Sequence, residues 1–282
     1  MIEIIFQKDR DARRMYGHIV DCLRAGQPGS GLVQLDEDRR RIKIDSNAMP
    51  DEAFHTVREG VYEFIALKKR DDWFREILEE RFFYEDSHEQ EQILEVIYSV
   101  IDGNREDLEP FLSGPDEKQI VQEAISEIFT DSISFSFDSF VTFRLKPFFD
   151  KLHSYVEVAI DEYKLEQEYQ MFVQTLRDFL AGRPALKPLI HLIVAEGTFF
   201  YDEHVCQITR SELIRTIDRK LLGNHPVYVD SVTIAPLLSL APSVIRLYTD
   251  LPEQPLVRTI CNIFEERVKI SPLHSFNQKN AQ

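Results

Sequence analysis

The chain has 282 residues, of which 43% are hydrophobic and only ten are glycine and thirteen proline. A chain of this length and composition can bury a sizeable core, which indicates a globular rather than a disordered protein. Its 33 Lys and Arg against 49 Asp and Glu give a formal net charge of −16. Such a charge disfavours binding to nucleic acid and to anionic lipid surfaces.

The first fifty residues predict a small mixed unit. Residues 2–6 have the composition of a strand, and the apolar residues of 12–23 recur at the spacing of one helical face. Residues 31–44 then predict a hairpin. Its basic run, Arg39 to Lys43, gives one alternative function, weak binding to nucleic acid.

From Pro50 to residue 182 the apolar period is helical. The apolar stripes of the first helices fall at 54–65, 73–78, 93–101 and 120–129, and Ser87 with Gln90 predicts a capping box. Residues 51–130 contain 22 acidic and 8 basic side chains, a net charge of −14. We interpret these charges as the solvated side of a helical bundle, which would attract a basic partner.

The stretch FSFDSFVTFRLKPFF, residues 135–149, places six phenylalanines around Arg144 and Lys146. Its apolar period changes from two to three and four, which predicts an extended entry into a helix of up to ~35 residues, or ~50 Å. We expect the two cations to cover the phenylalanines with their stems while their charged heads reach water or an acidic side chain. The alternative is that they hold an anion at the start of the helix.

The expected long helix also carries a run of carboxylates. Paired carboxylates can act as acid and base or bind a hard cation, so with the two cations they suggest a metal- or anion-dependent enzyme as an alternative. The candidate polar cluster comprises Arg144, Lys146, Asp161, Glu162, Glu166 and Glu168. Because such runs more often form a wet helix face, we expect no catalytic, metal-binding or cofactor-binding residue, and the prediction leans against an enzyme.

After residue 182 the apolar runs become short. Residues 189–201 predict a hairpin, and Thr209 with Glu212 predicts the capping box of a helix that reaches Leu221. A strand is expected at 243–248 and a last helix at 257–268.

The expected fold class is α+β, a predominantly helical bundle with a small mixed unit at each end. Its predicted parts are an N-terminal unit of residues 1–49, an acidic helical bundle of 50–182 with a long central helix, and a C-terminal unit of 183–282. Each end unit is too small to bury its own strands, so the pattern allows one sheet shared between them.

The three cysteines, Cys22, Cys206 and Cys261, are far apart and form no C-x-x-C pair, which speaks against a disulfide framework and a zinc site. The N-terminus lacks the features of a secretory signal, and no apolar run approaches the ~20 residues of a spanning helix. We therefore expect a cytoplasmic protein with no membrane association.

Four short segments of the sequence are similar to those of one family. They are SFVTFRLK at 139–146, AIDEYKLEQEYQMFVQTLRDFL at 159–180, IAPLLSLAPSVIRLY at 234–248 and TICNIFEERVKI at 259–270. Through these segments the chain resembles the YtxC-like family of Bacillus-type spore formers over most of its length. The resemblance implies a cytoplasmic protein linked to sporulation, with no established active site to carry over. Some members of that family have cysteines after the segment matching RVKI, where this chain has Ser271 and Pro272, so a role of those cysteines is absent here.

The preferred hypothesis is a non-enzymatic interaction or assembly protein that binds a basic protein partner through its acidic helical surface. The absence of a phosphate-loop, zinc-protease, nucleophile-elbow or kinase motif in the sequence favours it over an enzyme. The sequence leaves the partner's identity and the oligomeric state open.

Overall fold

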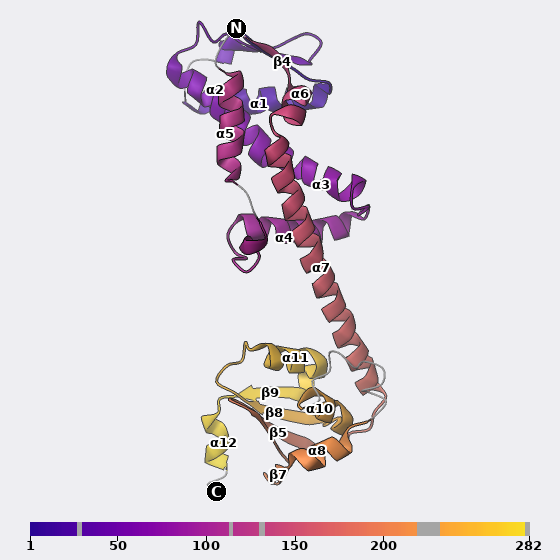
Figure 1. Ribbon diagram of the computed structural model, residues 1–282. Helices are drawn as coiled ribbons and strands as arrows, with labels where there is room; N and C mark the ends of the chain where they lie inside the picture. The colour runs from indigo at the N-terminus through magenta and orange to yellow at the C-terminus, as the bar shows by residue number, and fades with distance from the viewer. Residues whose placement is uncertain (27–29, 113–114, 130–132, 219–231, 280–282) are drawn as a thin grey trace. The chain divides into compact units, whose positions relative to one another are not determined.

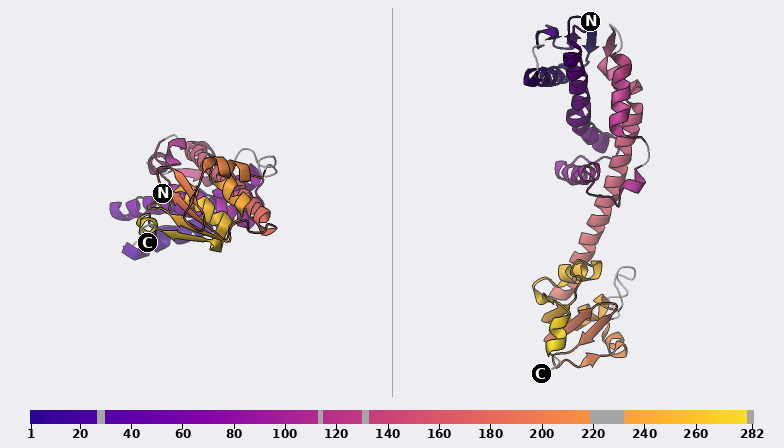
Figure 2. Two further views of the ribbon diagram at one scale, coloured as in Figure 1. Left: turned by 90° about the horizontal axis from the view of Figure 1, so that it is seen from below. Right: turned by 90° about the vertical axis from the view of Figure 1, so that its left-hand side faces the viewer.

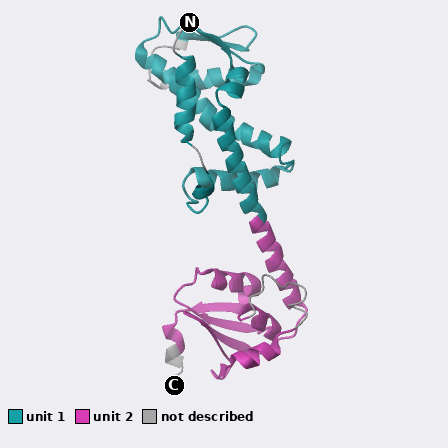
Figure 3. Cartoon of the chain, in the orientation of Figure 1, with its two compact units in different colours: residues 1–164 teal, residues 165–282 magenta. Residues whose placement is uncertain are grey.

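The computed structural model describes residues 1–26, 30–112, 115–129, 133–218 and 232–279. The chain forms two compact units, Met1–Lys164 (unit 1) and Leu165–Gln282 (unit 2), shown in Figure 3. Each unit combines helices with one small sheet, which confirms the α+β class. The division of the sequence into three parts at residues 50 and 183 stays a prediction.

Unit 1 contains a four-stranded sheet in the order β2-β3-β1-β4 (Figure 1). Its strands are β1 (Ile2–Ile5), β2 (Val33–Leu35), β3 (Arg41–Ile44) and β4 (Ser134–Ser136). The antiparallel pairing of β2 with β3 confirms the predicted hairpin, whereas β4 runs parallel to β1. One face of the sheet is buried in the same core as α1 (Asp9–Gly26), which begins with two acidic residues in its first turn. The buried residues of that face are Ile2, Ile4, Val33, Ile42 and Ile44.

The acidic segment forms the helices that its apolar period predicts. They are α2 (Asp51–Glu63), a π-helical turn (Phe64–Lys69), α3 (Arg70–Glu80), α4 (Ser87–Ile101) and α5 (Glu117–Ile128). Short 3₁₀ turns lie at Ser30–Leu32 and Glu109–Phe111. The predicted capping box at Ser87 is wrong, because Asp86 takes the N-cap position and its carboxylate accepts from the N–H groups of His88 and Glu89.

The phenylalanine-rich stretch forms β4, α6 (Phe137–Phe143) and the start of α7 (Lys146–Ala181). The hydroxyl of Ser136 accepts from the N–H of Ser139 and begins α6, so the predicted change from extended chain to helix is confirmed. The predicted long helix is also present, since α7 has 36 residues and runs without a break in Figure 1 and in the right-hand view of Figure 2.

Aromatic rings fill much of the core of unit 1. Phe137 stacks on Phe6 with ring centroids 4.8 Å apart, and Phe149 packs on Trp73 at the same separation. Phe148 is fully buried beside them. The stretch that opens α7 therefore supplies the centre of a hydrophobic core rather than an exposed apolar surface.

Unit 2 contains a five-stranded sheet in the order β7-β6-β5-β8-β9. Its strands are β5 (Leu189–Val194), β6 (Thr198–Tyr201), β7 (Gln207–Ile208), β8 (Val244–Tyr248) and β9 (Val268–Ser271). Its helices beyond α7 are α8 (Arg210–Thr216), α10 (Ile234–Leu240), α11 (Pro255–Phe264) and α12 (His274–Lys279), with a 3₁₀ turn at Glu265–Arg267. The predicted hairpin β5–β6 and the capping box of Thr209 with Glu212 are confirmed.

Two further expectations differ from the structure, and a third is not tested by it. The described strands form two separate sheets, so the arrangement with one shared sheet is wrong. The last predicted helix ends at Phe264, and Val268 lies in β9, because the chain leaves the helical conformation at Glu265, whose φ is 47°. The predicted helix end near Leu221 lies outside the described residues.

Candidate functional site

The two cations of the phenylalanine-rich stretch point away from the core. Arg144 forms an ion pair with Glu127, with 2.8 Å between Nη1 and Oε2, and both side chains are largely exposed. Lys146 is exposed at the first residue of α7. Arg144 thus reaches a carboxylate of the acidic segment, as the preferred interpretation of this stretch expects.

The carboxylates of α7 form separate local contacts. Glu162 accepts a hydrogen bond from Nη2 of Arg105 at 2.8 Å, and Glu166 accepts one from Nε2 of Gln170 at 2.6 Å. The exposed members of the run also include Asp161 and Glu168.

The structure does not gather the candidate polar cluster into one place. Lys146 and Glu162 are 16 residues apart on one helix, which separates them by about 24 Å along its axis. A shared catalytic or metal site needs its groups within hydrogen-bond reach of a common atom. The role of the cluster as a site stays a prediction, and other parts of unit 1 offer better geometry.

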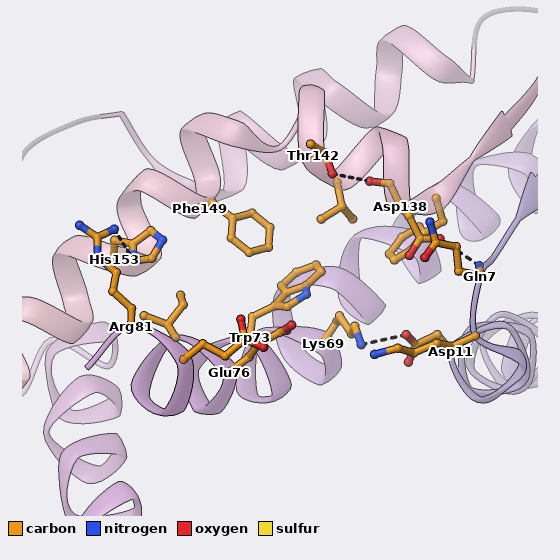
Figure 4. A pocket seen from close by; sticks show the side chains of 15 residues that line it. Gln7, Asp11, Lys69, Trp73, Glu76, Arg81, Asp138, Thr142, Phe149 and His153 are labelled. Atoms are coloured by element: carbon orange, nitrogen blue, oxygen red, sulfur yellow. Dashed lines mark hydrogen bonds and ion pairs between the residues drawn. The ribbon is translucent and has the colours of Figure 1, made fainter. Parts of the chain in front are cut away.

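A cavity of about 490 Å³ lies among α1, α3, α6 and α7 (Figure 4). Two pairs of polar side chains join its walls. Nζ of Lys69 lies 2.9 Å from Oδ2 of Asp11, and a guanidinium N–H of Arg81 points at Nδ1 of His153 across 3.3 Å (Figure 4). Trp73 lies between these two pairs.

The polar groups that α6 contributes to the cavity form local hydrogen bonds. The hydroxyl of Thr142 donates to the main-chain oxygen of Asp138 at 2.9 Å, and the Asp138 carboxylate accepts from the N–H of Gln7 at 3.0 Å. Among the described residues that line it, no nucleophile lies beside a general base. The lining therefore provides no arrangement for nucleophilic catalysis.

We expect His153 to make the stability of unit 1 depend on pH. Burial, and then the charge of Arg81, lower the pKa of His153 below its ordinary value near 6.5, while Glu157 and Asp150 act in the opposite direction. The unfolded chain therefore takes up the proton first as pH falls. The contribution of the neutral imidazole is complete above about pH 6.5 and is lost as pH falls toward the lower folded pKa.

We expect His153→Asn to reduce the loss of thermal stability between pH 7 and pH 5. The measurement is the melting temperature of both proteins across that range. Parallel curves for wild type and variant would show that His153 does not cause the dependence.

A second hollow, the acidic groove, lies between α3 and α4 and has a volume of about 440 Å³. It is lined by Asp71, Arg75, Glu91, Leu94, Glu95, Tyr98, Ser99, Asp102 and Asn104. Four of these side chains are carboxylates and one is a guanidinium. Glu91 and Glu95 are exposed, and they lie one turn apart on α4, so both face the same side of the helix.

The floor of the acidic groove is held by a small polar network. Asp71 accepts from the hydroxyl of Tyr98 and from Nε of Arg75, each at 3.1 Å. Burial, together with the charge and hydrogen bond of Asp71, raises the pKa of Tyr98 to about 12, so its hydroxyl stays protonated. The one guanidinium of the groove is therefore already paired, and the outer carboxylates are left facing solvent.

The whole acidic segment, residues 51–130, exposes many more carboxylates than cations. Of the 22 carboxylates in residues 51–130, 16 are exposed, whereas only 3 of its 8 Lys and Arg are exposed. The inner cations form ion pairs within unit 1, such as Arg70 with Glu117 and Lys69 with Asp11. The sequence predicts the acidic surface, but it does not identify the groove, because Asp71 and Glu91 line the same hollow only through the packing of α3 on α4.

The basic hairpin strand has ion pairs of its own. Arg41 lies 3.7 Å from Asp38, and Lys43 lies 3.4 Å from Asp36. These carboxylates partly neutralise the run Arg39–Lys43, so nucleic-acid binding there stays a prediction without structural support. Across the part of the chain that the structure describes, no helix combines the length and the apolar character needed to cross a bilayer.

The fold and its sites define an α+β protein with an acidic helical unit that carries a carboxylate-lined groove. Residues 55–269 match the YtxC-like family. A protein of Bacillus subtilis (strain 168) with the name "Uncharacterized protein YtxC" is 38% identical over 281 residues, which cover 98% of this chain and 96% of that relative. The chain therefore belongs to the YtxC-like family. No solved structure matches it.

Proposed function

We propose that the protein is a non-enzymatic interaction or assembly protein that binds a basic protein partner through unit 1. The observation that carries this proposal is the imbalance of exposed charge on residues 51–130, with 16 exposed carboxylates against 3 exposed cations. A surface of this kind attracts cationic partners and speeds their association. The link to sporulation and to the cytoplasm rests on the family resemblance.

The acidic groove is the part of this surface with the best shape for a basic side chain. Glu91 and Glu95 form no ion pair with the residues that the structure describes, while Asp71 and Arg75 hold the floor in place. A lysine or arginine entering the groove gains charge-assisted hydrogen bonds from carboxylates that are held on two packed helices. The candidate cluster on α7 is less suited, because its cations and carboxylates do not converge.

Charge reversal in the groove is expected to weaken binding of a basic ligand. Glu91→Lys with Glu95→Lys should lower the affinity for a fluorescein-labelled oligo-arginine peptide by about tenfold or more, measured by fluorescence anisotropy at fixed salt. Both residues are exposed, so stability should change by no more than about 1 kcal/mol for the pair. Binding to wild type should also weaken as salt concentration rises.

The matched control is Glu166→Lys with Glu168→Lys, which changes the net charge by the same amount at an exposed site outside the groove. We expect this control to retain most of the affinity. Equal loss in both variants would assign binding to overall charge and contradict the groove. If wild type does not bind the peptide even at low salt, a basic partner is excluded.

The role in sporulating cells has a separate test. Tagged wild-type protein expressed at its normal level should retain a basic protein from sporulating cells, and the groove variant should lose that same protein while the control variant keeps it. Retention that does not differ among the three proteins would contradict the proposed partner. A wild-type sporulation frequency in the deletion strain would contradict the cellular role.

A further inference from the structure

Three metal-binding side chains meet between α1 and α2. Nε2 of His18 lies 3.0 Å from Oε2 of Glu63, and Sγ of Cys22 lies 3.7 Å from each of these two atoms. Within the described residues, this is the one group of three His, Cys, Asp or Glu ligand atoms that converge closely enough to hold a metal ion. It lies outside the acidic groove and outside the cavity of Figure 4.

Local helix geometry builds this cluster. His18 and Cys22 are four residues apart on α1, so their side chains project from the same face. Glu63 is the last residue of α2, and the π-helical turn follows it directly; such turns often occur at functional sites. Gly60 lies one turn before Glu63 and faces Cys22, because a Cβ on Gly60 would lie 3.7 Å from Sγ of Cys22. A Cβ at that distance is in ordinary van der Waals contact, so α1 and α2 are packed against each other beside the cluster.

The spacing of the three donor atoms fits a tetrahedral zinc ion. Zinc binds thiolate sulfur at about 2.3 Å and imidazole nitrogen or carboxylate oxygen at about 2.0–2.2 Å. With tetrahedral angles, these bond lengths place sulfur about 3.6 Å from each of the other donors and nitrogen about 3.4 Å from oxygen. The observed separations are 3.7, 3.7 and 3.0 Å, so shifts of a few tenths of an ångström would suffice.

Charge and exposure also suit a cation. The side chain of His18 is 13% exposed and that of Glu63 is 43% exposed, so the cluster is covered on one side and reaches solvent on the other. A thiolate and a carboxylate beside a neutral imidazole carry two negative charges, which one divalent cation neutralises. Burial, and then Glu63, raise the pKa of the Cys22 thiol, so an incoming metal ion has to displace its proton. Lys68 and Asp21 act on this thiol in opposite directions.

We propose that His18, Cys22 and Glu63 bind one zinc-class divalent cation, with a fourth position open to water. The combination of thiolate and imidazole selects zinc-class ions over magnesium and calcium, which prefer all-oxygen sites. The bound ion joins α1 to the end of α2 and stabilises unit 1 because it binds only the folded chain. The site does not depend on the proposed protein partner.

The competing explanation is a simple hydrogen-bonded pair of His18 and Glu63 with Cys22 beside it by chance. Purified full-length protein, first stripped with a chelator, separates the two explanations. We expect it to take up one zinc ion per chain by elemental analysis and to melt at a higher temperature with zinc, but not with magnesium. Cobalt in place of zinc should give a thiolate-to-metal charge-transfer band.

Two variants complete the test. Cys22→Ser keeps the size of the side chain and should weaken zinc binding on the order of a hundredfold, with loss of the cobalt charge-transfer band. Cys206→Ser is the matched control, because Cys206 is an exposed cysteine near His204 and is the natural place for adventitious zinc. It should retain both the stoichiometry and the band. Circular dichroism confirms that each variant is folded.

Two results would overturn the proposal. One is the absence of stoichiometric zinc in the wild-type protein at micromolar concentrations. The other is a loss in Cys206→Ser equal to that in Cys22→Ser, which would assign the metal to surface thiols.

Discussion

Phe148→Ala is expected to lower the free energy of unfolding of unit 1 by about 3–5 kcal/mol. The Phe148 ring is fully buried, and its centroid lies 6.2 Å from the Trp73 ring and 6.4 Å from that of Phe149. Alanine would leave a cavity that these rigid rings cannot fill. Because domains of this size have stabilities of about 5–15 kcal/mol, the variant should lose a large part of its margin.

Urea titration measures this effect. Trp73 is the single tryptophan of the chain and is buried beside Phe148, so its fluorescence reports on unit 1. The control is Phe143→Ala, from the same phenylalanine-rich stretch, whose side chain is exposed and whose loss should cost less than about 1 kcal/mol. Similar midpoints for the two variants would show that the stretch is not the centre of the core.

The helices of unit 1 could be predicted because local patterns specify them. The apolar spacing of the sequence includes Phe137, Phe140 and Phe148, and all three are buried in the core, the first two from α6 and the third from α7. The end of α4 could also be predicted, because a glycine, Gly103, follows it. Its φ is 73°, a conformation that glycine adopts without strain. Period and termination signals are properties of short segments, so the sequence alone contains them.

The pairing of β4 with β1 could not be predicted in the same way. Ser134 pairs with Glu3 across 131 positions of sequence, and β4 has only three residues, too few to show a period. Its parallel alignment depends on how the intervening helices return the chain to the sheet. The end of α11 at Phe264 could not be predicted for a related reason. Apolar residues continue at helical spacing to Val268, although the backbone changes direction after Phe264.

The candidate sites, like the pairing of β4 with β1, could be predicted only in part from the sequence. The i, i+4 spacing of His18 and Cys22 is visible in the sequence, but their third partner, Glu63, is 41 positions after Cys22. For the acidic groove, the sequence indicates the charge of the surface and not its hollow. The composition of each helix face can be predicted from the sequence alone. A site that lies between two packed helices can be identified only when their packing is known.

A largely buried ion pair joins several elements of unit 1. Nη1 of Arg70, at the start of α3, lies 3.1 Å from Oε2 of Glu117, at the start of α5, with side-chain exposures of 11% and 16%. The Arg70 guanidinium also lies 5.7 Å from the ring centroid of Tyr98 in α4. Burial, and then Glu117, raise the pKa of Tyr155 in α7, whose hydroxyl stays protonated as a result. The pair therefore touches four helices.

Glu117→Gln is expected to destabilise unit 1 by about 3 kcal/mol, because it leaves the Arg70 charge buried without a partner. Replacing both residues, Arg70→Met with Glu117→Leu, should recover most of that loss, since no charge then remains in the interior. Urea unfolding followed by circular dichroism at 222 nm gives the free energies of the wild type, of Glu117→Gln and of the double variant.

The ion pair of Arg144 with Glu127 provides the matched control. It joins the same two residue types at 2.8 Å, but its side chains are 59% and 57% exposed. Glu127→Gln should change the stability by no more than about 1 kcal/mol, because water screens an exposed pair and solvates the charge that remains. An equal loss for Glu127→Gln, or a double variant less stable than Glu117→Gln, would show that burial of the Arg70 charge is not the cause.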